Sequence, residues 1–194
     1  MSGGHAELPV AARVRAFEER VIGAGLTTDA ELEEILAGVY ASASPVNGAR
    51  MVARAWIDPA YRDRLLADGN AAADELGFAA GARGYLLKVV ENTPGVHNVI
   101  VCTLCSCYPT SLLGPSPTWY KSFAYCSRVV REPRAVLAEF GLELPSGTHI
   151  RVWDANSETR YLVLSRPPEN ADGLDEDALA AQVSRNGLIG TAAR

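Results

Sequence analysis

Lysine is almost absent from this chain of 194 residues, which carries only Lys88 and Lys121 beside sixteen arginines. The net charge is −5 and the arginines are scattered evenly, which argues against a nucleic-acid partner. No apolar run approaches the roughly 20 residues that a membrane-spanning helix needs. The N-terminal residues lack the basic and apolar segments of a signal peptide, so we expect a cytoplasmic protein without a membrane anchor.

Cysteine is also scarce, and its placement is uneven. The chain has four cysteines, and three of them fall within residues 102–107, in the stretch VCTLCSCYPT. Because cytoplasmic thiols are kept reduced, clustered cysteines in such a protein are more often metal-binding or catalytic than cross-linked.

The first part of the chain has helical character. Apolar residues recur at helical spacing from Val10 to Val21, and Thr28 with Glu31 forms a capping box before the next apolar face. Further helices are expected over 49–56 and from Pro59 to Gly77. We predict an N-terminal helical arm over residues 1–80, which lies against its own domain or another subunit.

From about residue 84 the pattern changes to strands and short helices. Strands are expected over 85–90, 97–101, 149–154 and 160–165, with the last two joined by an Asn/Ser-rich turn. Residues 110–117 read as a loop, and helices are expected over 119–130, 132–140 and 176–183. The predicted fold class is α+β, with the arm followed by a metal-binding catalytic domain over residues 81–194 around a small sheet.

The three clustered cysteines have the spacing C-x-x-C-x-C, which lets Cys102, Cys105 and Cys107 converge on one point. Cys105 and Cys107 are too close for an unstrained disulfide, whereas a single metal would engage all three thiols. A zinc site would need a fourth ligand such as His97, Cys126 or His149, and an iron–sulfur cluster would need Cys126.

A second arrangement would complete the coordination from the main chain. Deprotonated peptide nitrogens of Ser106 and Cys107 would close a square plane with two of the sulfurs. Cys102 would then be axial, and the opposite axial position would stay open for water or substrate. Such anionic donors suit trivalent cobalt or iron, so zinc, iron–sulfur and this set are all open at this point.

The cluster and its flanks resemble the α subunit of nitrile hydratase. The similarity extends over nearly the whole chain through landmarks that occur in the same order: Asn47–Arg50, Glu91–Pro94, Val101–Pro109, Trp119–Ser122, Arg131–Arg134, Val136–Gly141, Glu158–Tyr161 and Ile189–Gly190. The resemblance implies a heteromeric metalloenzyme that adds water to a nitrile to give an amide. Thr103 corresponds to the cobalt type, so one Co(III) per chain is expected and iron is the less suitable metal.

The resemblance also assigns roles to residues. The metal ligands would be Cys102, Cys105, Ser106 and Cys107, with Cys105 oxidised to a sulfinic acid and Cys107 to a catalytic sulfenic acid. Arginines of a β subunit, or of split β-like subunits, would pair with the oxidised sulfurs. The cobalt-binding subunit of thiocyanate hydrolase shares the motif and is an alternative, and a non-catalytic zinc-binding interaction module is another.

The chain departs from the family near the motif. Thr110 stands where the family usually has a tryptophan that walls the substrate pocket, and Trp119 is a further candidate for that wall. The smaller side chain suggests a pocket for a bulky heteroaromatic nitrile, such as one on a nucleoside-like scaffold; the alternative is drift compensated by the partner subunit. Cys126 stands where the family tends to have arginine. We interpret Cys126, His97 and His149 as structural.

Overall fold

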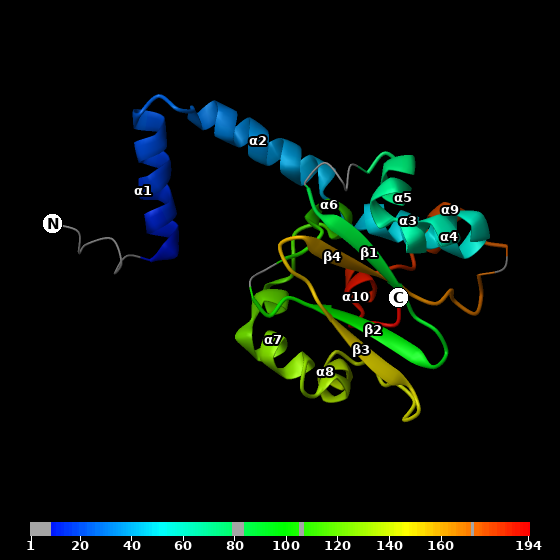
Figure 1. Cartoon of the computed structure of the whole chain (residues 1–194). Helices are drawn as coiled ribbons and strands as arrows, with labels where there is room; N and C mark the ends of the chain where they lie inside the picture. The colour runs from blue at the N-terminus through cyan, green and yellow to red at the C-terminus, as the bar shows by residue number, and fades with distance from the viewer. Residues whose placement is uncertain (1–8, 79–83, 105–106, 172) are drawn as a thin grey trace. The chain divides into compact units, whose positions relative to one another are not determined.

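The computed structural model describes residues 9–78, 84–104, 107–171 and 173–194. The chain divides into two compact units, Met1–Ala41 and Ser42–Arg194. Figure 1 shows the elements of both units. Among the described residues, no helix combines the length and the apolar character that crossing a membrane requires.

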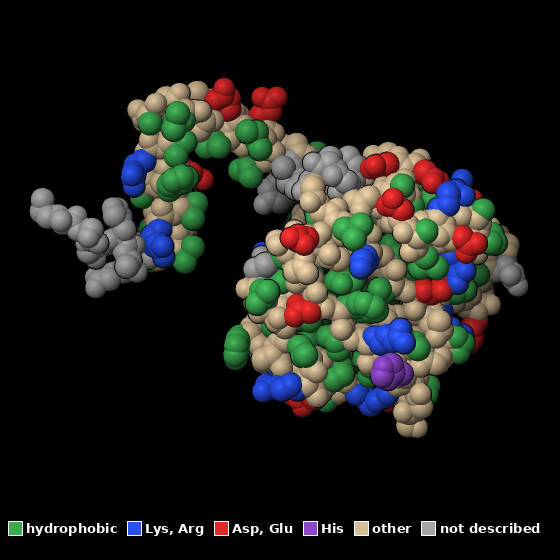
Figure 2. Space-filling view, in the orientation of Figure 1, with side chains coloured by type: hydrophobic (Ala, Val, Ile, Leu, Met, Phe, Trp, Pro, Cys, Tyr) green, Lys and Arg blue, Asp and Glu red, His purple; other side chains and the backbone are tan. Residues whose placement is uncertain are grey.

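The first unit holds the helices α1 (Val10–Gly23) and α2 (Asp29–Ser42), the second of which ends at the boundary. The expected capping box is present, because Glu31 N–H donates to Thr28 Oγ1 at 3.2 Å and Thr28 N–H donates to the Glu31 carboxylate at 2.8 Å. Helix α1 buries none of its residues. Figure 2 shows hydrophobic side chains exposed along both helices; the large ones are Val10, Val14, Phe17, Leu26, Ile35 and Leu36.

The second unit begins with three helices that carry N-terminal caps. They are α3 (Pro45–Ile57), α4 (Pro59–Ala67) and α5 (Gly69–Glu75). The side chains of Ser44, Asp58 and Asp68 accept hydrogen bonds from the first turns of α3, α4 and α5 respectively. The single helix expected from Pro59 to Gly77 is therefore two helices, because Asp68 leaves the helical conformation and caps the second one.

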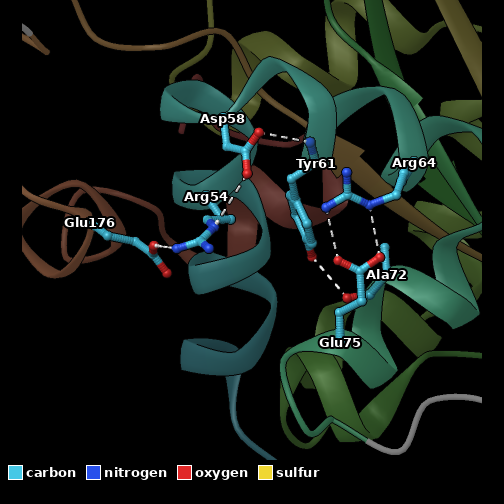
Figure 3. A network of polar contacts seen from close by, with 7 residues as sticks. All are labelled: Arg54, Asp58, Tyr61, Arg64, Ala72, Glu75 and Glu176. Carbon is cyan, nitrogen blue, oxygen red and sulfur yellow. Dashed lines mark hydrogen bonds and ion pairs between the residues drawn. The ribbon is translucent and has the colours of Figure 1, made fainter.

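Polar contacts tie these helices together (Figure 3). Arg64 forms a bidentate pair with Glu75, at 2.9 and 3.0 Å, which joins α4 to α5. Buried Tyr61 donates its hydroxyl to the Ala72 carbonyl at 3.1 Å. Arg54 of α3 pairs with Glu176 of α9 (Glu176–Ala180) at 2.8 Å.

The strands form two parallel pairs. Strand β1 (Leu86–Glu91) pairs with β4 (Thr159–Leu164), and β2 (Val96–Val101) pairs with β3 (His149–Asp154). Strands β3 and β4 were expected to form one pair joined by a turn, and that expectation is wrong. Each finds a partner from the first two strands instead, so the turn after Asp154 connects two sheets rather than closing a hairpin.

Short helices surround the strands in the rest of the unit. They are α6 (Thr110–Leu113), the 3₁₀ helix η2 (Thr118–Lys121), α7 (Phe123–Val129), α8 (Pro133–Glu139), α9 and α10 (Arg185–Ile189). Residues 110–117 contain α6 and are not wholly a loop, as the sequence suggested. The helix expected over 119–130 is interrupted at Ser122, whose side chain accepts from Tyr125 N–H and begins α7.

The compact units divide between Ala41 and Ser42, whereas the boundary predicted from the sequence lies between residues 80 and 81. Helices α3 to α5 lie in the second unit because they contribute to its hydrophobic core. Their fully buried side chains pack in one cluster with Leu87 and Leu162 of the strands; they are Met51, Val52, Leu65 and Ala72. The α+β class holds, with two small sheets in place of one. That residues 1–80 act together as an arm against a partner stays a prediction.

One buried contact fixes the beginning of β2 to the C-terminal end of the chain. The His97 ring accepts a hydrogen bond from Asn92 at 3.2 Å and donates one from Nε2 to the Gly190 carbonyl at 2.8 Å. Gly190 follows α10 with φ of 90°, and a Cβ there would lie 2.1 Å from the Asn98 carbonyl oxygen. Glycine is required at this position because the backbones approach too closely for any side chain.

Candidate metal centre

The cysteine-rich segment, residues 102–107, follows β2 directly and is called the metal loop below. Strand β2 ends at Val101, and the next residue, Cys102, is 1% exposed. Cys107, at the other end of the loop, is 7% exposed. Cys105 and Ser106, which the sequence analysis assigned to the same site, lie outside the described residues.

The loop is attached to the end of the neighbouring strand. Asp154 accepts the Thr103 N–H at 2.9 Å and the Thr103 hydroxyl at 2.5 Å. Ala155 N–H donates to the Val101 carbonyl at 2.7 Å, which extends the parallel pairing of β2 and β3 by one more bond. The parallel register, with Val101 opposite Asp154, is what brings this carboxylate to the loop.

Three side chains from η2 and α7 donate to main-chain carbonyls at and beside the loop. Tyr125 donates its hydroxyl to the Ile100 carbonyl at 2.6 Å, one step before the strand ends. The Cys126 thiol lies 3.3 Å from the Cys102 carbonyl oxygen. Tyr120 donates to the Cys107 carbonyl at 3.1 Å.

These donors are held in their protonated forms. Burial raises the pKa of Tyr120 and of Tyr125 well above the usual range, because a buried phenolate loses its hydration. Burial also raises the pKa of the Cys126 thiol, and the nearby Cys102 and Asp154 add to that rise. Each of the three groups therefore carries the hydrogen that its contact requires.

The two histidines considered as ligands lie away from the loop. His97 and His149 occupy the beginnings of β2 and β3, whereas the loop lies where these parallel strands end. Both ring nitrogens of His97 are already engaged, and burial lowers its pKa. His149 is exposed. Their positions agree with the structural interpretation and leave the zinc alternative without these ligands.

The two candidate pocket residues both follow the loop in sequence and have different surroundings. Thr110 is half-buried at the first position of α6, and its N–H donates to the Tyr108 carbonyl at 2.9 Å. Trp119 is half-buried and packs edge-to-face against Tyr125 and Phe140, with ring centroids 4.9 and 4.6 Å apart. That either residue contacts substrate stays a prediction.

Large apolar side chains are exposed beside the loop. Leu104, within the loop, is 84% exposed, and Phe123, at the beginning of α7, is 87% exposed.

The donor chemistry of the loop fits a thiolate-bound metal. Among the described residues, which omit Cys105 and Ser106, no three His, Cys, Asp or Glu side chains are grouped as a metal site. The site predicted from the sequence includes Cys105 and Ser106, which lie outside the described residues. The buried thiols of Cys102 and Cys107, on a loop with anchored ends, suit a metal that takes sulfur donors.

Several residues that shape this site were missed from the sequence. From the sequence, Tyr120 is interpreted as core or pocket wall and Asp154 as a residue that fixes a turn or a subunit contact, whereas Tyr125 has no predicted role. Their roles depend on pairing between distant segments, for which no local pattern exists. The single available signal was the density of aromatic residues in Trp119–Tyr125, since buried tyrosines need acceptors.

The fold and the anchored loop define the class of protein: an α+β chain with a cysteine-rich loop after a parallel strand. The family described as nitrile hydratase, alpha chain, matches residues 8–192. The chain belongs to this family, as the resemblance of its motifs indicated.

Its relatives include both cobalt and iron enzymes. The cobalt-containing nitrile hydratase subunit alpha of Pseudonocardia thermophila is 46% identical over 183 residues, which cover 93% of this chain and 89% of that protein. The thiocyanate hydrolase subunit gamma of Thiobacillus thioparus is 43% identical, over 91% of this chain and 76% of that protein.

Two solved structures have the same fold as this chain. A double mutant of the Fe-type nitrile hydratase from Comamonas testosteroni Ni1 superposes with a TM-score of 0.89 at 39% identity, covering 95% of this chain and 91% of that one. A recombinant thiocyanate hydrolase with partially modified cobalt centres gives a TM-score of 0.87 at 41% identity, covering 96% and 90%.

Proposed function

We propose that this chain is the metal-binding catalytic subunit of a nitrile hydratase, which hydrates a nitrile to an amide. The observation that carries the proposal is the C-x-x-C-S-C motif on an anchored loop in a chain of the nitrile hydratase alpha-chain family. Cobalt is the proposed metal, with iron the less suitable one, since the similar curated subunits include cobalt-containing ones.

The ligands in this proposal are the thiolates of Cys102, Cys105 and Cys107 and the main-chain nitrogens of Ser106 and Cys107. A bound Co(III) would supply Lewis acidity toward the nitrile and a low pKa for the thiols. Cys105 would be oxidised to a sulfinic acid and Cys107 to a sulfenic acid. The sulfenate oxygen of Cys107 would act toward the nitrile carbon as nucleophile or base, and one water molecule would enter the amide product.

The same proposal requires a partner subunit. Helix α1 buries none of its own residues, and Leu104 and Phe123 stand exposed beside the loop. A β-type subunit that covers these surfaces would bury apolar area and exclude water from the reaction. It would also bring arginines to the oxidised sulfurs, for which a bidentate guanidinium is well suited.

The proposed substrate is a bulky heteroaromatic nitrile. Support comes from Thr110, which stands directly after the Cys107–Pro109 segment with a side chain much smaller than the tryptophan of the family pattern. A smaller wall leaves volume for a ring system, provided that the partner subunit does not fill it.

Thiocyanate hydrolysis is the second candidate function. It is favoured by the 43% identity to the thiocyanate hydrolase subunit gamma and by the TM-score of 0.87 to a thiocyanate hydrolase. In that case the same loop would serve hydrolysis of thiocyanate to carbonyl sulfide and ammonia.

Intact-mass and metal analysis of the full chain, isolated with its partner, tests the proposal. About one cobalt per chain together with three added oxygen atoms on Cys105 and Cys107 is expected, whereas zinc with unmodified thiols would overturn it. Amide formation from a nitrile then separates the first function from the second, which would release carbonyl sulfide from thiocyanate.

A further inference from the structure

Two side chains outside the cysteine motif join the two ends of the metal loop. The Cys126 thiol lies 3.3 Å from the Cys102 carbonyl oxygen and 3.5 Å from the Tyr120 carbonyl oxygen. Tyr120 donates its hydroxyl to the Cys107 carbonyl at 3.1 Å. The side chains of Cys126 and Tyr120 therefore contact the main chain at the two ends of the loop.

Side chains donate hydrogen bonds to the carbonyls at these two positions. Strand β2 ends at Val101, so the carbonyl of Cys102 lies beyond the ladder, and Cys107 precedes the first turn of α6. Both residues are buried, and hydrogen bonds compensate a buried carbonyl for its lost hydration. The phenol of Tyr120, itself 1% exposed, and the half-buried thiol of Cys126 supply such hydrogen bonds.

We propose that Cys126 and Tyr120 are positioning residues, which hold Cys102 and Cys107 at the separation that metal binding by the loop requires. This inference rests on the proposed metal site. Its physical reason is that groups behind the ligands fix ligand orientation before the metal arrives, so less ordering has to accompany binding. Neither side chain touches the metal or substrate in this proposal; each acts through a ligand residue.

Three substitutions and one matched control test the role. Tyr120→Phe and Cys126→Ala each remove one donor, whereas Cys126→Ser keeps a donor on nearly the same side-chain length. Tyr61→Phe is the control, because Tyr61 is also 1% exposed and donates to a main-chain carbonyl at 3.1 Å, but within the helices α4 and α5. Tyr61→Phe removes the same hydroxyl from an equally buried tyrosine, at a position distant from the loop in sequence.

The measurement uses the full chain loaded with cobalt chloride in air, and follows the release of cobalt to a chelator together with the thermal unfolding midpoint. Tyr120→Phe and Cys126→Ala should release cobalt at least about tenfold faster than the wild type, in line with the usual effect of outer-shell changes. Cys126→Ser should restore nearly the wild-type rate. Tyr61→Phe should lower the unfolding midpoint as much as Tyr120→Phe while leaving cobalt release unchanged.

Two results would overturn the inference, and they differ. If the wild type holds cobalt, and Tyr120→Phe and Cys126→Ala both release it at the rate of Tyr61→Phe, the positioning role fails while the proposed function stands. If the wild type holds no cobalt, the proposed function fails and the inference fails with it. Should Tyr120→Phe not fold, the comparison of Cys126→Ala with Cys126→Ser decides alone.

Discussion

Asp154 accepts two hydrogen bonds from Thr103, one from the backbone N–H at 2.9 Å and one from the hydroxyl at 2.5 Å. The two residues lie 51 positions apart and meet because β2 and β3 are parallel and end together. The contact fixes the residue that follows Cys102, so the first half of the metal loop has one defined path.

Replacing Asp154 should therefore weaken metal binding. In Asp154→Ala both acceptors are lost, so neither the Thr103 N–H nor the Thr103 hydroxyl keeps its partner at the end of β3. We expect cobalt affinity to fall about 10- to 100-fold, measured by competition with a chelator. Asp177→Ala is the control, because Asp177 forms an exposed ion pair with Arg50 at 3.3 Å. Equal affinity in the two variants would contradict the prediction.

Thr110 should determine the size of the substrate. We expect the wild-type enzyme to turn over a large heteroaromatic nitrile in preference to a small aliphatic one. Thr110→Trp should lower kcat/KM for the large nitrile by about tenfold or more and leave the small one nearly unchanged, because pocket contacts discriminate on this scale. Thr118→Trp, at an exposed position, serves as the control. A wild-type preference for the small nitrile would refute the roomy pocket.

Acid should destabilise the fold through His97. Burial lowers the pKa of His97 below its usual 6.5, so the folded state favours the neutral ring, whose Nδ1 accepts from Asn92. The contribution of neutral His97 to the free energy of unfolding is fully present above pH 6.5. It is lost as the pH falls from 6.5 toward the lower pKa of the folded state, because the unfolded chain binds the proton more readily. Urea unfolding between pH 8 and 5.5 measures the effect.

The matched variant for this experiment is His97→Gln, which keeps polar groups but does not titrate. It should be less stable than the wild type at pH 8 and should lose less stability over the same pH range. If the free energy of unfolding falls equally with pH in the two proteins, titration of other groups determines the loss of stability over this range, and the prediction is contradicted.

Gly190 should tolerate no side chain. Gly190→Ala would place a Cβ 2.1 Å from the Asn98 carbonyl oxygen at a φ of 90°, and would displace the carbonyl that His97 contacts. We expect a loss of about 3 kcal/mol or more in the free energy of unfolding, from strain and overpacking together. Gly147→Ala should change little, since nothing lies within 4 Å of a Cβ there. Comparable unfolding midpoints for the two variants would rule out the close approach.

Local features of the fold could be predicted from the sequence. The capping box of Thr28 and Glu31 and the start of α4 at Asp58-Pro59 depend on residues a few positions apart, and both occur as expected. The strands were also located within a residue or two. Their pairing was not, because β3 and β4 have turn residues between them that resemble a hairpin, while their partners lie earlier in the chain.

In the candidate site, too, the features that depend on nearby residues could be predicted, and those that depend on distant segments could not. Cys102, Cys105 and Cys107 could be proposed as ligands from the sequence because metal chemistry depends on their spacing, which is local. Tyr120, Cys126 and Asp154 contact the loop from segments that are brought there only by tertiary packing. A sequence pattern reports which side chains can bind a metal, whereas the groups that orient those side chains depend on the whole fold.

The parallel pairing of β2 with β3 also sets an order of events during synthesis. The cysteines of the loop emerge from the ribosome well before Asp154, so the anchor at Thr103 cannot form until most of the chain has been made. Contacts between distant segments form late because closing the intervening chain costs entropy. The nascent chain therefore presents three thiols on an unanchored segment first, and the folded loop is completed only near the end of translation.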